Sequence, residues 1–297
     1  MSSEELLLAY NALLRLRDSL AYEDFVEADR NELSAVTPEQ RLDIRQRLQQ
    51  PPLSKISYEN LLEMKITLSG VLSLKPNSMD RLAKTTSLAQ NELWSSANLY
   101  RHLNYLDGTV PQGTGTDARP WIDAFFFRAS AMLPPDKRMI LTNGHTVPAM
   151  TVNPLNRLTV DYIAIVTNQC TASSVLRSPN HDMLRMYMLS GFLFIEARGF
   201  PLSADIPRAV SEMYASGKIL QRKFLRGALT NGREWIFLLI KFNDDYEGAS
   251  YMQSALIEFR SLRDFDGRVE AATPWPDVIA AILSDWASFI LICMTIC

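Results

Sequence analysis

The chain has 297 residues, of which 47% are hydrophobic, and it carries a formal net charge of −3. This length and composition suffice for a large apolar core in one or two domains, and they exclude a disordered or collagen-like chain. The weak negative charge neither indicates nor excludes nucleic acid as a partner, because a local basic patch can bind phosphates within a mildly acidic protein.

The cysteines and the N-terminus predict an intracellular protein, cytoplasmic or nuclear, without a signal peptide. Cys170, Cys293 and Cys297 are scattered, which argues against a disulfide scaffold or a cysteine-ligated zinc site and favours a reducing compartment. The first residues carry acids before arginines, unlike a secretory signal. The histidines lack ligand spacing, and no serine-hydrolase, P-loop or dinucleotide motif is found.

Residues 1–106 are expected to form an α-helical N-terminal section. Leucines recur at helical spacing in residues 6–20, and a further helix begins at Thr37-Pro38 and stops at Pro51-Pro52. Another helix is expected to start at Ser57, and one long helix is expected through residues 78–106. This section ends at a loop over residues 107–120, where glycine, threonine and proline accumulate.

Residues 121–297 are expected to form an α/β core with C-terminal helices. A helix resumes at residues 121–133, and Asn143-Gly144 is interpreted as a hairpin turn. The sequence then predicts strands, helices and an apolar C-terminus in the following order: a strand at 157–167, a strand ending the segment 181–200, a helix at 205–229, a strand at 233–243, and helices at 251–264 and 276–289.

The apolar C-terminus is expected to be a core helix followed by a tail. Asp285 interrupts it, and the run that follows is shorter than the roughly 20 residues needed to cross a bilayer. No clear membrane segment is therefore predicted, with a membrane-seeking tail as the alternative.

Each of two successive predicted strands carries an acidic residue within or at the end of its apolar run. Asp161 lies within "TVDYIAIV", and Glu196 and Arg198 lie in "FIEARGF", with a helix and "GREWIFLLI" after them. This order resembles the PD-(D/E)XK nuclease superfamily, whose signature is an acid on one strand and an acid-x-lysine triplet on the neighbouring strand. The resemblance covers roughly residues 155–242 and looks closest to divergent fungal and effector-type members.

The resemblance implies a restriction-endonuclease-like mixed sheet core flanked by helices, with Asp161 and Glu196 as ligands of Mg²⁺. Phosphodiester hydrolysis uses Mg²⁺ to hold the phosphate and to lower the pKa of an attacking water, and this ion prefers carboxylate oxygens. Neighbouring strands lie about 5 Å apart, so they can bring two carboxylates together. A lysine two residues after the second acid would lie on the same side and stabilise developing charge.

Arg198 stands where the family has lysine. Arginine can contact phosphate, but its pKa is too high for a base. Some family members carry the lysine on the following helix, which makes Lys218 and Lys223 candidates here. A third carboxylate on a preceding helix is also common in the family, and Glu92 is the candidate.

A basic stretch in the predicted helix 205–229 is a candidate nucleic-acid contact. Lys218, Arg222 and Arg226 are four residues apart and would share one helix face, with Lys223 beside them. A solvated charged face explains the same pattern equally well.

The sequence therefore favours a nuclease-like protein that binds nucleic acid, with Mg²⁺-dependent hydrolysis as its candidate activity. One alternative is an inactive nuclease fold, a pseudoenzyme acting as a binding or regulatory module. Another is a helical interaction scaffold. The candidate site residues also have purely structural explanations. Asp161 could pair with Arg198, Glu196–Arg198 could be a strand-end ion pair, and Glu92 could be a solvated helix residue.

Overall fold

In the computed structural model, the described helices and strands all lie within residues Pro52–Cys297. The expected helices in residues 1–55 lie outside the described residues. The described ranges are 56–74, 76, 78–111, 117–147, 158–177, 192–197, 201–259, 261–263, 269–287 and 294–296.

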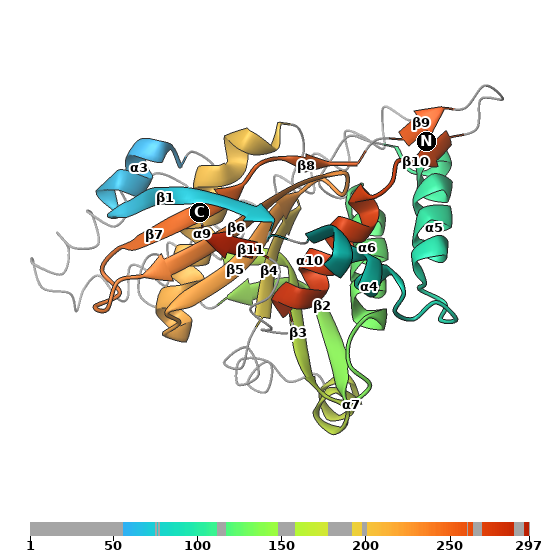
Figure 1. Cartoon of the computed structure of the whole chain (residues 1–297). Helices are drawn as coiled ribbons and strands as arrows, with labels where there is room; N and C mark the ends of the chain where they lie inside the picture. Colours follow the sequence, from blue (N-terminus) through green and yellow to red (C-terminus); the bar gives the residue numbers. More distant parts are fainter. Residues whose placement is uncertain are drawn as a thin grey trace, which may run out of the picture. The chain divides into compact units, whose positions relative to one another are not determined.

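A mixed β-sheet runs through the described residues (Figure 1). Its order is β11-β1-β7-β6-β5-β4-β3-β2, with β8 paired to β6, which makes nine described strands; β9 and β10 form a separate pair. The strands are β1 (Ile66–Leu74), β2 (Lys137–Val147), β3 (Leu158–Asn168), β4 (Phe192–Ala197), β5 (Phe224–Thr230), β6 (Glu234–Phe242), β7 (Ala249–Ser254), β8 (Ile257–Glu258), β9 (Ser261–Arg263), β10 (Val269–Ala271) and β11 (Met294–Ile296).

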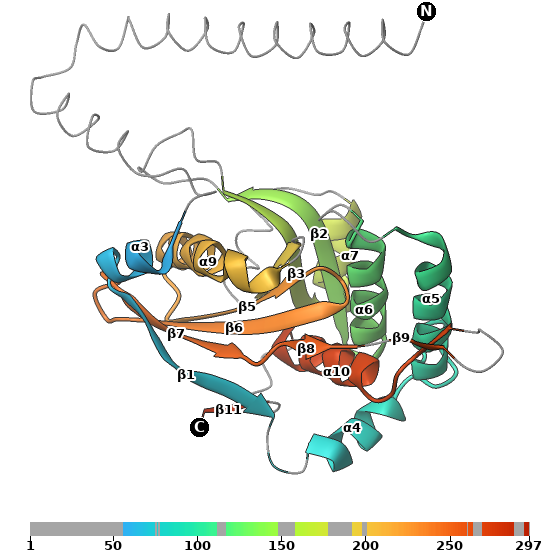
Figure 2. The ribbon, with the colours of Figure 1, turned by 90° about the horizontal axis from the view of Figure 1, so that it is seen from above.

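Helices cover both faces of the sheet, and each face has its own apolar core. Successive side chains of β6 point alternately into the two cores: Trp235 and Phe237 lie in one, and Ile236 and Leu238 lie in the other. Figure 2 shows α9 along one side of the sheet and α10 along the other. The first side carries α3 (Tyr58–Glu63), α7 (Gln169–Arg177), the 3-10 turn η2 (Leu202–Asp205) and α9 (Ile206–Leu220); the second carries α4 (Ser78–Thr86), α5 (Ser96–Thr109), α6 (Arg119–Ala131) and α10 (Trp275–Ala287).

The predicted α/β class is confirmed as a mixed sheet flanked by helices. The predicted strands at 157–167 and 233–243 are present as β3 and β6, and the predicted helix at 121–133 is present as α6. The apolar C-terminal segment contributes α10, which is buried along almost its whole length. None of the helices in the described ranges is both long enough and apolar enough to cross a membrane.

The predicted helix 205–229 is wrong in its second half. Helix α9 ends at Leu220 because Gln221 adopts a left-handed conformation, with φ of 51°. Residues 224–230 then form β5, between β4 and β6. Leu225 and Leu229 enter the core under α9, whereas Ala228 enters the other core, so this segment follows the two-residue period of a strand.

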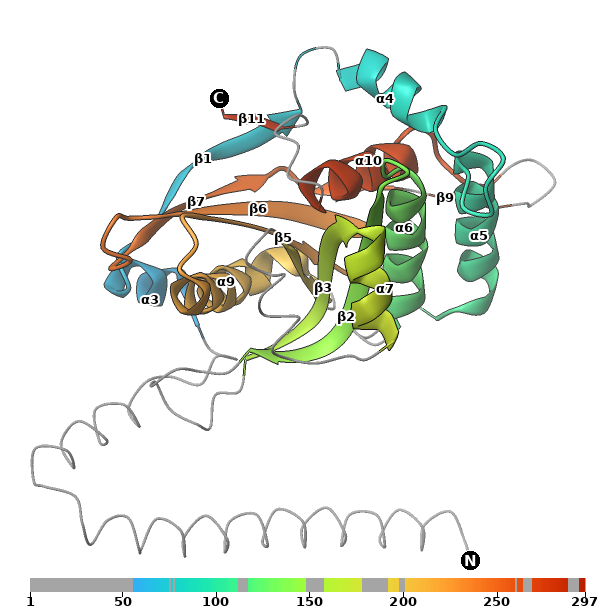
Figure 3. The ribbon, with the colours of Figure 1, turned by 90° about the horizontal axis from the view of Figure 1, so that it is seen from below.

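The N-terminal section is not purely helical, and the loop at 107–120 is not a boundary between two units. Strand β1 pairs in parallel with β7 inside the main sheet. The long helix expected at 78–106 is divided into α4 and α5 by a turn region over residues 87–94. Figure 3 shows α5 beside α6, and both contribute buried residues to one core.

Two further expectations are corrected by the strands. Asn143-Gly144 is not a turn, because both residues lie inside β2, which pairs with β3 over residues 137–147. The segment 251–264 is not a helix, since it contributes β7, β8 and β9. The turn at Asn231-Gly232 does connect two strands, β5 and β6, and Gly232 has the positive φ of 88° that such turns use.

Candidate functional site

The register of β3 and β4 places Asp161 opposite Glu196. The two strands are antiparallel, and Tyr162 pairs with Ile195 while Ile163 pairs with Phe194. One step further along the same register brings position 161 opposite position 196. Facing residues of antiparallel strands have Cα atoms about 4.5–5.5 Å apart. The backbone therefore brings the two predicted metal ligands to one place on the sheet.

The described neighbours of this pair are apolar and buried. Ile163 follows Asp161 by two residues and is fully buried, as is Leu229, the register partner of Glu196 on β5. Both belong to the core under α9. Charges attract more strongly in such surroundings than in water, and a carboxylate without a partner is costly there. A carboxylate beside these residues would need a cation or hydrogen-bond donors, or it would take up a proton.

Arg198, the residue in the lysine position, lies outside the described residues. The alternative pairings Asp161–Arg198 and Glu196–Arg198 lie outside them for the same reason.

Lys218 and Lys223 are far from the carboxylate pair. Strands β4 and β5 are parallel, and Glu196 is level with Leu229. Lys223 precedes Leu229 by about six residues, which is roughly 20 Å along extended backbone. Lys218, in the last turn of α9, contacts the turn after β6, at the same distant end. Neither lysine can therefore replace the missing lysine of the motif.

Both lysines also have carboxylate partners of their own. Lys218 Nζ lies 2.8 Å from Glu247 Oε1, and Lys223 Nζ forms an ion pair with Asp244. These side-chain contacts raise the pKa of each lysine. Because a raised pKa keeps an amine protonated, it opposes a role as a general base.

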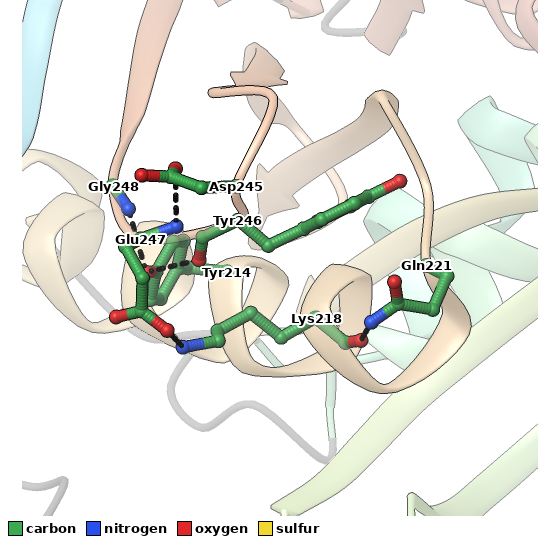
Figure 4. A network of polar contacts seen from close by, with 7 residues as sticks. All are labelled: Tyr214, Lys218, Gln221, Asp245, Tyr246, Glu247 and Gly248. Atoms are coloured by element: carbon green, nitrogen blue, oxygen red, sulfur yellow. Dashed lines mark hydrogen bonds and ion pairs between the residues drawn. The ribbon is translucent and has the colours of Figure 1, made fainter.

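The contacts around Lys218 fasten the turn after β6 to α9 (Figure 4). Tyr214 Oη accepts a hydrogen bond from Gly248 N and donates one to Tyr246 O, each at 3.0 Å. Gln221 Nε2 donates to Lys218 O at 2.8 Å. The network joins a helix to a strand connection, so its role is structural.

The predicted basic helix face does not exist. Arg222 follows the end of α9, and Arg226 lies on β5. Arg226 Nη1 donates to Trp286 O at 3.2 Å, at the C-terminal end of α10. Burial lowers the pKa of Arg226, an effect that the nearby Asp285 opposes. A cation beside the last carbonyls of a helix is stabilising, so Arg226 has a structural explanation.

Glu92 is not on a helix. It lies in the exposed turn region between α4 and α5, the helices that border the core away from α9. Its exposure agrees with a solvated residue. His102, for which no ligand role was predicted, packs edge-on against Trp94 with ring centroids 5.2 Å apart.

The donor set at positions 161 and 196 fits a hard divalent cation. Two carboxylates supply the oxygen ligands that Mg²⁺ prefers. Among the residues whose side chains are described, no group of three or more histidine, cysteine, aspartate or glutamate residues could hold a metal ion. The Asp161 and Glu196 side chains are not among those residues.

The chain matches no protein-family profile, and it matches no curated protein.

Proposed function

We propose that residues 155–242 form a nuclease-like core that binds nucleic acid through Mg²⁺ held by Asp161 and Glu196. The observation that carries this proposal is the register of β3 and β4, which, continued by one residue beyond the pair Tyr162–Ile195, brings the two acids opposite each other. The two strands β3 and β4, with α9 after them, follow the order that the resemblance implies, although α7 lies between the strands. The strand that directly follows α9 is β5, and the expected strand "GREWIFLLI" is β6, one strand later.

In this proposal Asp161 and Glu196 hold the cation, and Arg198 contacts a phosphate oxygen. Bound Mg²⁺ supplies charge on the scissile phosphate and a lower pKa for an attacking water. The buried residues Ile163 and Leu229 exclude water from the side of the carboxylates that faces the core. Arg198 contributes a charge-assisted contact without acting as a base.

A second candidate is a metal-dependent binding module that does not cut. The positions of Lys218 and Lys223 favour it, because both lie at the distant end of the sheet and have carboxylate partners. Arginine occupies position 198, where the motif has lysine. Neither of the two candidate lysines, Lys218 and Lys223, reaches the carboxylate pair.

The test is a binding and cleavage assay on single- and double-stranded DNA and RNA, with Mg²⁺, with Mn²⁺ and with EDTA. The double variant Asp161→Asn/Glu196→Gln removes the charges, and Lys223→Met serves as a control at the distant end of the sheet. We expect metal-dependent binding that the double variant loses and Lys223→Met retains. Arg198→Lys restores the lysine of the motif and should raise cleavage if the site is otherwise complete.

The outcomes separate the candidates. Cutting that requires metal and the two acids supports the enzyme, whereas metal-dependent binding without cutting supports the binding module. The absence of both would contradict the proposal and favour a scaffold role.

A further inference from the structure

We propose that strand β2 borders the proposed metal site at Asp161 and Glu196 on the side where a phosphodiester binds. Gly144 leaves room for the phosphodiester, and Thr142 donates a hydrogen bond to it. This inference rests on the proposed function, and it assigns a role to a strand that the resemblance does not include. It identifies Gly144 as a positioning residue for the substrate.

Gly144 lies beside Asp161 in the sheet. On β2 and β3, Asn143 pairs with Tyr162 and His145 pairs with Val160. Gly144 is therefore opposite Asp161, on the side of β3 away from Glu196. Positions 144, 161 and 196 form one row across β2, β3 and β4. At the end of this row, Gly144 itself carries no side chain.

A glycine inside a strand is unfavourable unless something approaches it closely. Glycine loses more conformational freedom than other residues, and in strands it often marks a site where a ligand or backbone comes near. Strand β2 is the last strand of the described sheet order, so its outer side does not pair with another strand there. A phosphodiester can reach the row from this edge without breaking described strand pairs.

Thr142 supplies a polar group close to this row. Its strand partner is Ile163, and both Ile163 and the nearby Ile140 lie in the core under α9. Thr142 Oγ1 is buried and has no hydrogen-bond partner in the described part of the chain. Diagonal neighbours across two strands lie about 7–8 Å apart, so a phosphate bound at Asp161 comes within reach of this hydroxyl. Buried hydroxyls favour a partner, and a phosphate oxygen is a strong acceptor.

The competing explanation is that Gly144 is required by packing of the chain itself. Valine distinguishes the two, because it is favourable in strands and should not lower stability where space is open. Gly144→Val would then block the phosphodiester while leaving the fold intact. If the chain itself fills that space, Gly144→Val would unfold the protein more easily.

The experiment compares Gly144→Val, Gly144→Ala and Thr142→Val in the full chain. Thr142→Ser keeps the hydroxyl and serves as the matched control, and Thr67→Val introduces valine at an exposed position of β1. Binding of a fluorescent oligonucleotide is measured by anisotropy with Mn²⁺, binding of Mn²⁺ alone by calorimetry, and stability by thermal unfolding.

We expect Gly144→Val to weaken oligonucleotide binding by about tenfold or more while Mn²⁺ binding changes by less than about threefold. Thr142→Val should weaken oligonucleotide binding by roughly fivefold, and Thr142→Ser should restore most of it. The unfolding temperatures of these variants should match that of the wild type or exceed it.

Three results would overturn the inference. Unchanged oligonucleotide affinity in Gly144→Val would remove the role of the edge strand while the proposed function stands. Loss of stability in both Gly144→Val and Gly144→Ala would assign the glycine to packing. A wild type that binds neither Mn²⁺ nor oligonucleotide through Asp161 and Glu196 would refute both proposals together.

Discussion

The guanidinium of Arg128 is fully buried on α6, where it closes the end of a neighbouring helix. Its Nη1 donates to Leu88 O and Trp94 O at 3.0 and 3.2 Å, and its Nη2 donates to Thr85 O and Thr86 O at 3.1 and 3.4 Å. These carbonyls follow or end α4, where the helix itself leaves backbone acceptors without partners. Thr85 O also has a second donor, Leu88 N at 3.1 Å. One side chain thereby holds the whole connection between α4 and α5.

Replacing Arg128 with methionine should be strongly destabilising. Methionine fills part of the volume but removes the side-chain donors to Thr86 O, Leu88 O and Trp94 O. We therefore expect a loss of about 3 kcal/mol or more in the free energy of unfolding. Urea unfolding measures it. The matched change Arg101→Met, at an exposed position of α5, should stay within about 0.5 kcal/mol. Similar losses in the two variants would contradict this role for Arg128.

His102 should make stability depend on pH. Burial lowers its pKa below the ordinary value of 6.5. The folded protein therefore binds a proton at this site less readily than the unfolded chain does. The resulting stability is complete above pH 6.5 and declines as pH falls from 6.5 to the lower pKa of the folded state.

His102→Phe keeps a ring against Trp94 and removes the titrating group. We expect the urea midpoint of the wild type to fall, relative to that of His102→Phe, as pH is lowered from 7.5 to 5. The comparison cancels the titration of all other groups. Parallel pH profiles for the two proteins would show that His102 does not contribute.

Among single residues, the sequence makes Asp161 and Glu196 candidates, but it does not reveal which residues lie opposite them in the sheet. An acid inside an apolar strand is conspicuous wherever the strand lies. The relevance of Gly144 depends on the pairing register of β2 with β3, which a sequence pattern does not specify. The same glycine beside asparagine has the composition of a turn, so local chemistry favoured the wrong structure.

At the level of elements, the distance between α9 and the sheet depends on a glycine. A β-carbon at Gly217 would overlap the ring of Phe242 and lie 2.8 Å from Leu225 Cδ1. At Gly108 in α5, a β-carbon would meet nothing within 4 Å. The same substitution should therefore have opposite effects in the two helices.

Gly217→Ala should lower the free energy of unfolding by about 1–3 kcal/mol, because the helix must move away from β6. Gly108→Ala should raise it by up to about 1 kcal/mol, since alanine restricts the unfolded chain and favours a helix. Urea unfolding of the two variants side by side tests both signs. A gain in stability for Gly217→Ala would show that the packing of α9 on β6 is loose.

Elements with strong periodicity were predictable, and the others were decided by packing. Strands β3 and β6 are long and rich in apolar residues, and α6 and α10 have clear apolar content. Strand β5 follows a helix with only a short connection, so its leucines extend the helical pattern. Strand β1 leaves Leu68 and Val71 exposed, and its sequence therefore lacks the alternation of a half-buried strand.

For the whole unit, contacts between distant segments join the N-terminal section to the core. Ser69 Oγ on β1 donates to Tyr251 O on β7, 182 residues away, at 3.1 Å. Arg233, in the turn before β6, pairs with Asp107 of α5 and lies over the ring of Trp121, 4.5 Å from its centroid. Sequence patterns are local and do not reveal a pairing across this separation, so the loop at 107–120 has the appearance of a domain boundary.

This arrangement predicts that damage to β1 destabilises the core. Ile66 is almost fully buried in the core under α9. Ile66→Ala should therefore lower the free energy of unfolding by about 2–5 kcal/mol. Four of the five tryptophans, Trp121, Trp235, Trp275 and Trp286, lie beyond the predicted boundary, so tryptophan fluorescence mainly reports that part of the chain. If β1 belongs to the same cooperative unit, the urea midpoint measured by fluorescence must fall in Ile66→Ala. The control Val71→Ala alters an exposed residue of the same strand and should leave the midpoint nearly unchanged. An unchanged midpoint in Ile66→Ala would mean that the two sections unfold independently, as the boundary at 107–120 implied.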